Sequence, residues 1–128
     1  AEGHTKVVTV RVTGAMSDDE ARAGARKVAE SQLVKCSWYG QDPYWGRVAS
    51  ELGSAGIAFE ADKLSVRYGD LLVAEHGVTV DADPAAVAAY MAQEHLVVTA
   101  HLGLGDGTAR ILTNDLTHAY VDENMGTS

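Results

Sequence analysis

A chain of 128 residues, 46% of them hydrophobic, is long enough for one domain with a buried core and too short to make two domains the expectation. Its 18 acidic and 10 basic residues give a net charge of −8, which has the wrong sign for binding the phosphate backbone of nucleic acid. No apolar run approaches the roughly 20 residues that span a bilayer, and no signal-peptide pattern is present, so we expect no membrane segment and a cytoplasmic location.

The N-terminal segment predicts a strand followed by a helix. Residues 6–13 alternate valines with polar residues, the period of a strand that buries one face, and Gly14 is expected to end it. The sequence Ser17-Asp18-Asp19-Glu20 is a capping box, in which the serine oxygen and the glutamate carboxylate satisfy backbone donors reciprocally. Apolar residues then recur at three- and four-residue spacing as far as Leu33, which predicts a helix packed on a sheet.

The next segment predicts a short strand and a second helix. Residues 34–39 fit a strand. Asp42-Pro43 supplies an N-cap and a first helical residue, since aspartate accepts an orphan backbone N–H and proline lacks one. We expect this helix to turn Trp45 inward as a core anchor and to end at Gly53.

A hairpin and a third helix follow. Residues 64–68 and 71–75 flank Gly69-Asp70, a two-residue connection that is typical of tight hairpins. Asp83-Pro84 then opens a helix by the same capping chemistry. Its inner face is expected to carry three larger side chains, those of Val87, Tyr90 and Met91.

The end of the chain predicts a second hairpin. Residues 96–102 alternate apolar with polar positions, and residues 109–113 are expected to return antiparallel across the Gly105-Asp106-Gly107 turn. About six strands and about three helices, with hairpins between sequence neighbours, predict an α+β fold. We therefore expect residues 1–128 to form a single domain, a two-layer sandwich of a mostly antiparallel sheet with about three helices.

Residue types that could bind metal or phosphate have simpler explanations. The histidines lie far apart, and none is paired at the spacing of zinc ligands with another histidine or a cysteine, so we expect no metal site. His101 falls on the polar face of a predicted strand, where a hydrogen-bonded structural role is the better expectation. Gly103-x-Gly105-x-Gly107 precedes a strand pattern, whereas a phosphate loop opens a helix, so these glycines are assigned to the hairpin.

The single cysteine invites a catalytic interpretation that we do not adopt. Cys36 lies beside Lys35, which would favour a reactive thiolate. A nucleophilic cysteine also needs a base placed by the fold, and no local signature indicates one. Because free cysteine is among the most often buried residue types, a packing role is favoured.

The stretch from Leu33 to Arg47 carries the clearest functional signal. It contains Leu-Val-Lys-Cys and Asp-Pro-Tyr-Trp-Gly-Arg, and it resembles the Leu-Val-Lys-Thr and Asp-Pro-Asn-Trp-Gly-Arg signature of the glutamate N-acetyltransferase (ornithine acetyltransferase) family of arginine biosynthesis. Cys36 stands where that family has threonine, and Tyr44 stands where it has asparagine, so the expected relationship is that of a divergent paralogue.

The resemblance covers nearly the whole chain, with its motifs in family order. Residues 2–6, Glu-Gly-His-Thr-Lys, are similar to the family's Glu-Gly-Ala-Thr-Lys. Residues 103–109 are similar to its glycine-rich approach to the last strand, and residues 115–124 to its Asp-Leu-Thr-x-x-Tyr-Val-x-x-Asn tail.

This resemblance implies that the chain is the C-terminal part of the β subunit of a longer, self-cleaving precursor. In that family a threonine freed at the cut carries an acetyl group from N-acetylornithine to glutamate. The cut lies upstream of the resembling region, so the implied nucleophile is not in these residues, and the isolated chain is expected to be inactive. The implied partners are the α chain and the N-terminal part of the β chain in a hetero-oligomer, with no cofactor.

The resemblance also implies substrate-binding residues at the two ends. Glu2 matches the family's substrate-contacting glutamate, and a carboxylate there can pair with a substrate ammonium; the alternative is a solvated chain end. Asn124 matches the tail asparagine, whose amide can bind an α-amino acid head group. A C-terminal hydroxyl completes the implied clamp, and because the tail is shorter than the family pattern, either Thr127 or Ser128 fits that role. A frayed terminus is the competing interpretation.

Two functions from other classes stay open. The departures at Cys36 and Tyr44 support a non-catalytic module that binds an amino acid or docks on a partner. A purely structural oligomerisation domain is the third possibility, and it would expose an apolar patch without its partner.

Overall fold

The computed structural model describes residues 6–31, 34–35, 38, 45–114 and 121–122. The strands are β1 (Val7–Ala15), β2 (Ser65–Tyr68), β3 (Leu71–Glu75), β4 (Val78–Thr79), β5 (His95–His101), β6 (Gly107–Thr113) and β7 (Val121–Asp122). The helices are α1 (Asp18–Glu30), α3 (Gly46–Gly53) and α4 (Pro84–Met91), with a short 3-10 turn η1 at Ala61–Lys63.

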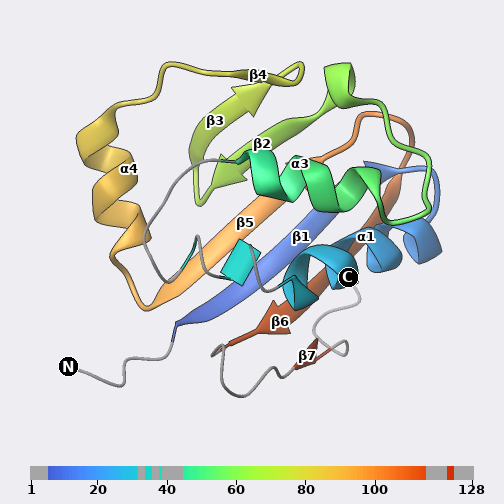
Figure 1. The fold of residues 1–128 in the computed structure, drawn as a ribbon, viewed down its shortest axis with the longest axis horizontal. Coiled ribbons are helices and arrows are strands. Elements are labelled where there is room, and N and C mark those ends of the chain that lie inside the picture. Colours follow the sequence, from blue (N-terminus) through green and yellow to red (C-terminus); the bar gives the residue numbers. More distant parts are fainter. Residues whose placement is uncertain (1–5, 32–33, 36–37, 39–44, 115–120, 123–128) are drawn as a thin grey trace.

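The described strands form one mixed, mostly antiparallel sheet. Its order is β4-β3-β2-β5-β1-β6-β7. Helices α1 and α3 cross the same face of this sheet, and α4 lies beside the ends of β2 and β5 (Figure 1). The predicted α+β sandwich is therefore confirmed. No helix in the described part of the chain has the length and apolar character needed to cross a membrane.

Strand β1 lies near the middle of the sheet and carries the predicted alternation. Val8, Val10 and Val12 are buried against the helices. β1 pairs parallel with β5 on one side and antiparallel with β6 on the other. The strand does not end at Gly14 as expected but continues to Ala15 past an irregularity in its pairing with β6.

The second predicted hairpin is wrong, because β1 lies between β5 and β6. The loop after β5 steps over the end of β1, where the N–H groups of Leu104 and Gly105 donate to the Gly14 carbonyl at 2.7 and 2.9 Å. A step across one strand spans about 10 Å, within reach of a short loop. The first hairpin is confirmed, since β2 and β3 pair antiparallel across Gly69-Asp70.

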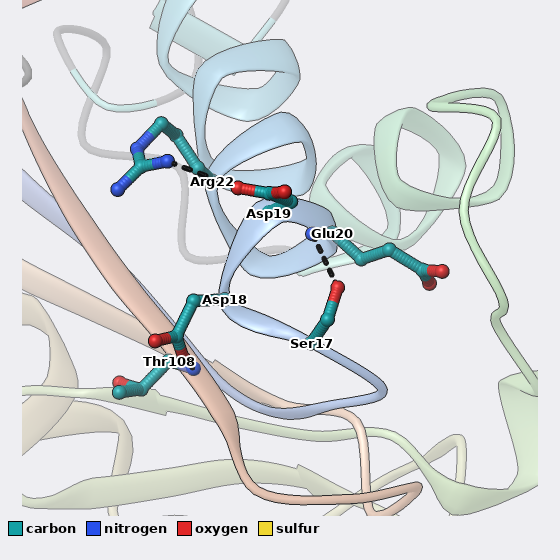
Figure 2. Close-up of polar contacts among 6 residues, drawn as sticks. All are labelled: Ser17, Asp18, Asp19, Glu20, Arg22 and Thr108. Carbon is teal, nitrogen blue, oxygen red and sulfur yellow. Dashed lines mark hydrogen bonds and ion pairs between the residues drawn. The ribbon is translucent and has the colours of Figure 1, made fainter.

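Helix α1 begins as its sequence predicts, but the capping box is only half made. The Glu20 N–H donates to the Ser17 hydroxyl at 3.1 Å, whereas the Glu20 carboxylate accepts from the Ala58 N–H at 3.0 Å. The Asp18 carboxylate accepts from the Thr108 N–H at 3.0 Å, which joins the helix start to β6 (Figure 2). The first turn of α1 thus connects two other parts of the fold.

The short strand predicted over residues 34–39 is wrong for every residue described there. Val34, Lys35 and Trp38 are helical. The cause is Ser31, whose hydroxyl accepts from the Val34 N–H at 3.2 Å and whose carbonyl accepts from the Lys35 N–H at 3.0 Å. A serine that caps a new turn at the end of α1 outweighs the strand preference of a short apolar run.

Helix α3 ends at Gly53, as predicted. The predicted Asp42-Pro43 cap lies outside the described residues. Trp45 precedes α3 and packs half-buried against the core, and its indole N–H donates to the Thr79 hydroxyl of β4 at 3.0 Å. The expectation of an inward Trp45 is therefore met in part, because one edge of the ring bonds to the strand.

Candidate functional site

The four predicted site residues, Glu2, Asn124, Thr127 and Ser128, lie outside the described residues, as do Cys36 and Tyr44. The candidate site is therefore built from the described elements to which the two predicted binding segments attach. These elements are the start of β1, which follows Glu2, and β7, which precedes Asn124.

The sheet places these two attachment points on either side of one residue. In the strand register Thr113 pairs with Val8 of β1, and it also pairs with Val121 of β7. Neighbouring strands are about 4.8 Å apart, so β1 and β7 are separated by about 10 Å. We call this region the Thr113 corner: Lys6, Val8, Thr113, Asn114 and Val121.

Short stretches of sequence join the two predicted binding segments to this corner. Glu2 precedes Lys6 by four residues, and Asn124 follows Asp122 by two. The strands to which the two segments attach thus lie on either side of Thr113, although nearly the whole sequence separates them.

Lys6 fixes the start of β1. Its ammonium donates to the carbonyl oxygens of Met91 at 3.0 Å and Gln93 at 2.7 Å, and the residue is only 8% exposed. The Val7 N–H donates to the Glu94 carbonyl at 2.8 Å. A side chain and the neighbouring backbone therefore hold the same end of the strand against the turn after α4.

The sequence contains a signal for the buried position of Lys6. Lys6 is two residues before Val8 and belongs to the same alternation as the buried valines of β1. A lysine at an inward position needs polar partners, because a buried ammonium without hydrogen bonds is strongly unfavourable. The carbonyls at the end of α4 meet that need.

Helix α4 is itself held to the sheet. The Asp83 carboxylate accepts from the Ala85 N–H at 3.1 Å, which confirms the predicted cap. The Tyr90 hydroxyl accepts from the Val97 N–H of β5 at 2.7 Å, and Met91 is buried. The carbonyls that bind Lys6 thus belong to the last residue of α4 and to the turn after it, next to a helix that is held to β5.

The Thr113 corner also contains buried polar oxygens. Thr113 is 1% exposed, and its hydroxyl has no hydrogen-bond partner within the described part of the chain. The side-chain oxygen of Asn114 is also buried and has no hydrogen-bond partner among the described residues. Because nearly all buried polar atoms are hydrogen-bonded, such a pair marks a place where a partner is expected. The sequence predicts a strand at Thr113, and the alternation also indicates its inward position, because it lies two residues after Ile111.

The motif segment contributes two fully buried side chains, Lys35 and Trp38. Both lie on the helical turn that replaced the predicted strand. Arg47, the last residue of the motif, is exposed at the start of α3. Core burial therefore explains Trp38, whereas it does not explain a buried lysine.

Other candidate groups are structural within the described residues. The His101 ring lies 2.9 Å from the Thr13 hydroxyl across the β1–β5 pair, in agreement with the expected structural role. No group of three potential metal ligands occurs among the residues described. The loop containing Gly103 leads into strand β6 and does not open a helix, as a phosphate-binding loop would.

Comparison with known proteins decides the family. The model of the ArgJ family matches residues 1–126. The chain belongs to the ArgJ family. The arginine biosynthesis bifunctional protein ArgJ of Mycobacterium tuberculosis is 45% identical to it over 128 residues, which are 100% of this chain and 31% of that protein. The ArgJ protein of Ruegeria pomeroyi is 45% identical over 124 residues, which are 96% of this chain and 30% of that protein.

A solved ArgJ structure has the same fold. The crystal structure of the arginine biosynthesis bifunctional protein ArgJ from Bacillus halodurans aligns with a TM-score of 0.85 and 30% sequence identity. The alignment covers 93% of this ArgJ-family chain and 56% of the solved one. The chain thus spans about a third of the length of the curated relatives it matches.

Proposed function

We propose that this chain acts within a longer ArgJ-family polypeptide as the C-terminal part of the β subunit of an acetyltransferase. The family match over residues 1–126 is the observation that carries this proposal. The names of the relatives, which describe bifunctional proteins of arginine biosynthesis, support it. The enzyme would work in the cytoplasm, as a hetero-oligomer of this segment with the α chain and the N-terminal part of the β chain.

The proposed reaction is acetyl transfer in two steps. A threonine outside these residues attacks the amide carbon of N-acetylornithine with its hydroxyl, and its own α-amine takes up the hydroxyl proton. The α-amine then passes this proton to the departing nitrogen as the C–N bond breaks, so that ornithine leaves as an amine. The amine of glutamate then attacks the resulting ester, which forms N-acetylglutamate and frees the threonine. Covalent catalysis of this kind divides one difficult step into two easier ones.

The present chain would supply part of the substrate clamp. Glu2 pairs with the ammonium of the amino-acid substrate, the Asn124 amide binds its head group, and Thr127 or Ser128 closes the site. Support comes from the Thr113 corner, where the strands that lead from Glu2 and to Asn124 flank one residue.

The test uses the complete natural polypeptide. We expect the purified protein to contain a chain that begins with threonine, and N-acetylornithine to add one acetyl group to it, as read by intact mass. We also expect N-acetylglutamate to form from N-acetylornithine and glutamate. If the protein formed neither the acetyl adduct nor N-acetylglutamate, the proposal would be contradicted. Amino-acid binding without an acetyl adduct would favour a non-catalytic module.

The clamp has its own prediction. Glu2→Gln in that enzyme should raise the KM for N-acetylornithine about tenfold to a hundredfold, since a hydrogen bond to a charged group contributes roughly 1.5–3 kcal/mol. Steady-state kinetics measures it. The control is Glu30→Gln on the exposed side of α1, where the carboxylate pairs with Arg26 at 2.8 Å. Equal KM values for the two variants would remove Glu2 from the site.

A further inference from the structure

We propose that the face of the sheet opposite α1 and α3 is a docking surface for an acidic face of the remaining part of the ArgJ-family polypeptide. This inference rests on the proposed function in one respect, since it takes the chain to act within a longer polypeptide. It is carried by the exposure, charge and register of four described strands, β1, β2, β5 and β6.

The sheet has one covered face and one open face. Helices α1 and α3 lie across the face on which Val8, Val10 and Val12 are buried (Figure 1). Successive side chains of a strand point to opposite faces, so the residues between these valines belong to the other face. The outward residues of β1 from Val7 to Thr13, and their partners in register on β5 and β6, are half-buried or exposed. No described helix therefore seals this side of the sheet.

Arginines line up across the open face. Arg11 of β1 is in register with Arg110 of β6 on one side and with Thr99 of β5 on the other. Thr99 is in turn in register with Arg67 of β2, and all three arginines are exposed. We call these four residues, Arg110, Arg11, Thr99 and Arg67, the arginine row. Because neighbouring strands are about 4.8 Å apart, the row extends over about 14 Å.

The charge of this region differs from that of the chain as a whole. The chain has 18 acidic residues and a net charge of −8, yet the described strands β1, β2, β5 and β6 contain no aspartate or glutamate. Like charges that face each other on adjacent strands destabilise a sheet, and Arg11 faces Arg110 in this way. An acidic partner laid against the open face would offset this repulsion.

The open face fits an extended surface better than a small anion. Leu112, Thr9 and Val97 are in register with one another in the row beside the arginines, and all three are half-buried. Apolar side chains next to arginine are typical of protein–protein interfaces, in which other charged residues are depleted. A cationic row of about 14 Å across four strands also exceeds the reach of a single carboxylate or phosphate group.

The length of the relatives indicates what occupies this face. The 128 residues are 31% of the Mycobacterium tuberculosis ArgJ protein, so most of a family polypeptide lies outside them. A second copy of this chain fits less well, because a two-fold contact sets a surface against itself and would place arginines against arginines. The remainder of the polypeptide has no such constraint, and its carboxylates can each accept two parallel hydrogen bonds from an arginine.

The experiment is zero-length cross-linking of the complete natural polypeptide. Arg11→Lys keeps the positive charge and supplies an amine, which a carbodiimide joins to a carboxylate that touches it. We expect mass spectrometry of the peptides to show a link from position 11 to an aspartate or glutamate outside the 128 residues. The matched control is Arg22→Lys on α1, where Arg22 lies 3.4 Å from Asp19. Its links should form within the chain, to Asp19.

Two cross-linking results would overturn the inference. One is a link from position 11 to a carboxylate within the 128 residues, in the same or a second copy. The other is no more linkage to the rest of the polypeptide from position 11 than from position 22. Failure of the proposed function is separate, because the wild-type enzyme would then form no N-acetylglutamate whether or not position 11 is linked.

Charge reversal gives a second test. Arg11→Glu in the complete polypeptide should lower the Tm by roughly 3–8 °C, because it sets one carboxylate against another in a covered interface. Replacing the cross-linked carboxylate with lysine in the same protein should restore most of the loss, since the two changes exchange the charges of one pair. Arg22→Glu, on the exposed side of α1, is the control and should change the Tm little. Independent, additive losses from the two reversals would contradict docking at this face.

Discussion

Gly69 lies at the contact between α4 and the sheet. Gly69 has a φ of +62°, which L side chains rarely adopt, and it also lies against the ring of Tyr90. The same ring carries the hydroxyl that accepts from Val97. Gly69 thus meets two demands at once, a left-handed turn and space for an aromatic ring.

These two demands can be separated by mutation. Gly56 also has a positive φ, of +77°, but nothing lies within 4 Å of the site of its missing Cβ. Gly56→Ala should therefore lower the free energy of unfolding by roughly 1–2 kcal/mol, the cost of the left-handed backbone alone. Gly69→Ala should lower it by at least about 3 kcal/mol, because the Tyr90 ring must move as well. Urea unfolding measures both, and equal losses would show that the ring gives way freely.

At the level of residues, the sequence predicted burial better than function. The inward valines of β1 follow from their period, and so does the inward position of Lys6, once it is read as part of the same alternation. What the alternation could not supply is the partner, since Met91 and Gln93 follow Lys6 by 85 and 87 residues. The same limit holds for Thr113, whose burial depends on β1 lying beside it.

Among the elements, α1 depends on its first turn. The Ser17 hydroxyl satisfies the Glu20 N–H, and the adjacent Asp18 joins the turn to Thr108 (Figure 2). Ser17→Ala should lower the free energy of unfolding by about 1 kcal/mol, the usual contribution of a serine cap. Thermal and urea unfolding of the variant would show it. Ser17→Thr keeps the hydroxyl and serves as the control, and an equal loss in both variants would mean that the cap contributes nothing.

Elements with strong local signals were predictable, and those decided by neighbours were not. Asp83 and Ser17 cap helices where the sequence places them, and Gly53 ends α3. The turn at Val34–Lys35 was mistaken for a strand, because a short apolar run fits both periods until the contacts of Ser31 are known. The prediction of a second hairpin failed for a different reason. The alternation of a strand shows which face is buried, but it does not specify the neighbouring strand.

For the whole molecule, the order of the sheet predicts where the fold opens. Strands β1 and β5 have neighbours on both sides, whereas β4 is a two-residue edge strand whose Val78 is 64% exposed. Amides in the middle of β1 and β5 should therefore exchange with solvent most slowly. Amides of β4 should exchange faster, because local opening is enough to expose them. Hydrogen exchange followed by NMR would test this ranking. Comparable protection of Val78 and Val10 would contradict it.

The fold class was predictable from periodicity, whereas the candidate site was predictable only by resemblance. Alternation and caps gave the helices and most strands without any relative. Glu2 and Asn124 came from motifs, and no physical pattern in the chain would have selected a glutamate and an asparagine near its two ends. The sheet adds a reason to consider them together, because Thr113 lies between the strands that lead to them.

The position of β1 also affects how the molecule is made. The parallel partner of β1, β5, begins at His95, 88 residues after Val7, and β6 comes later still. At roughly 5–20 residues per second, a ribosome would take on the order of 4–18 s to deliver the first of these partners. During that interval the valine face of β1 can be covered by the helices α1 and α3, but neither of its two neighbouring strands has been made. This sheet therefore closes late in synthesis, and chaperones have their longest opportunity to bind at its most buried strand.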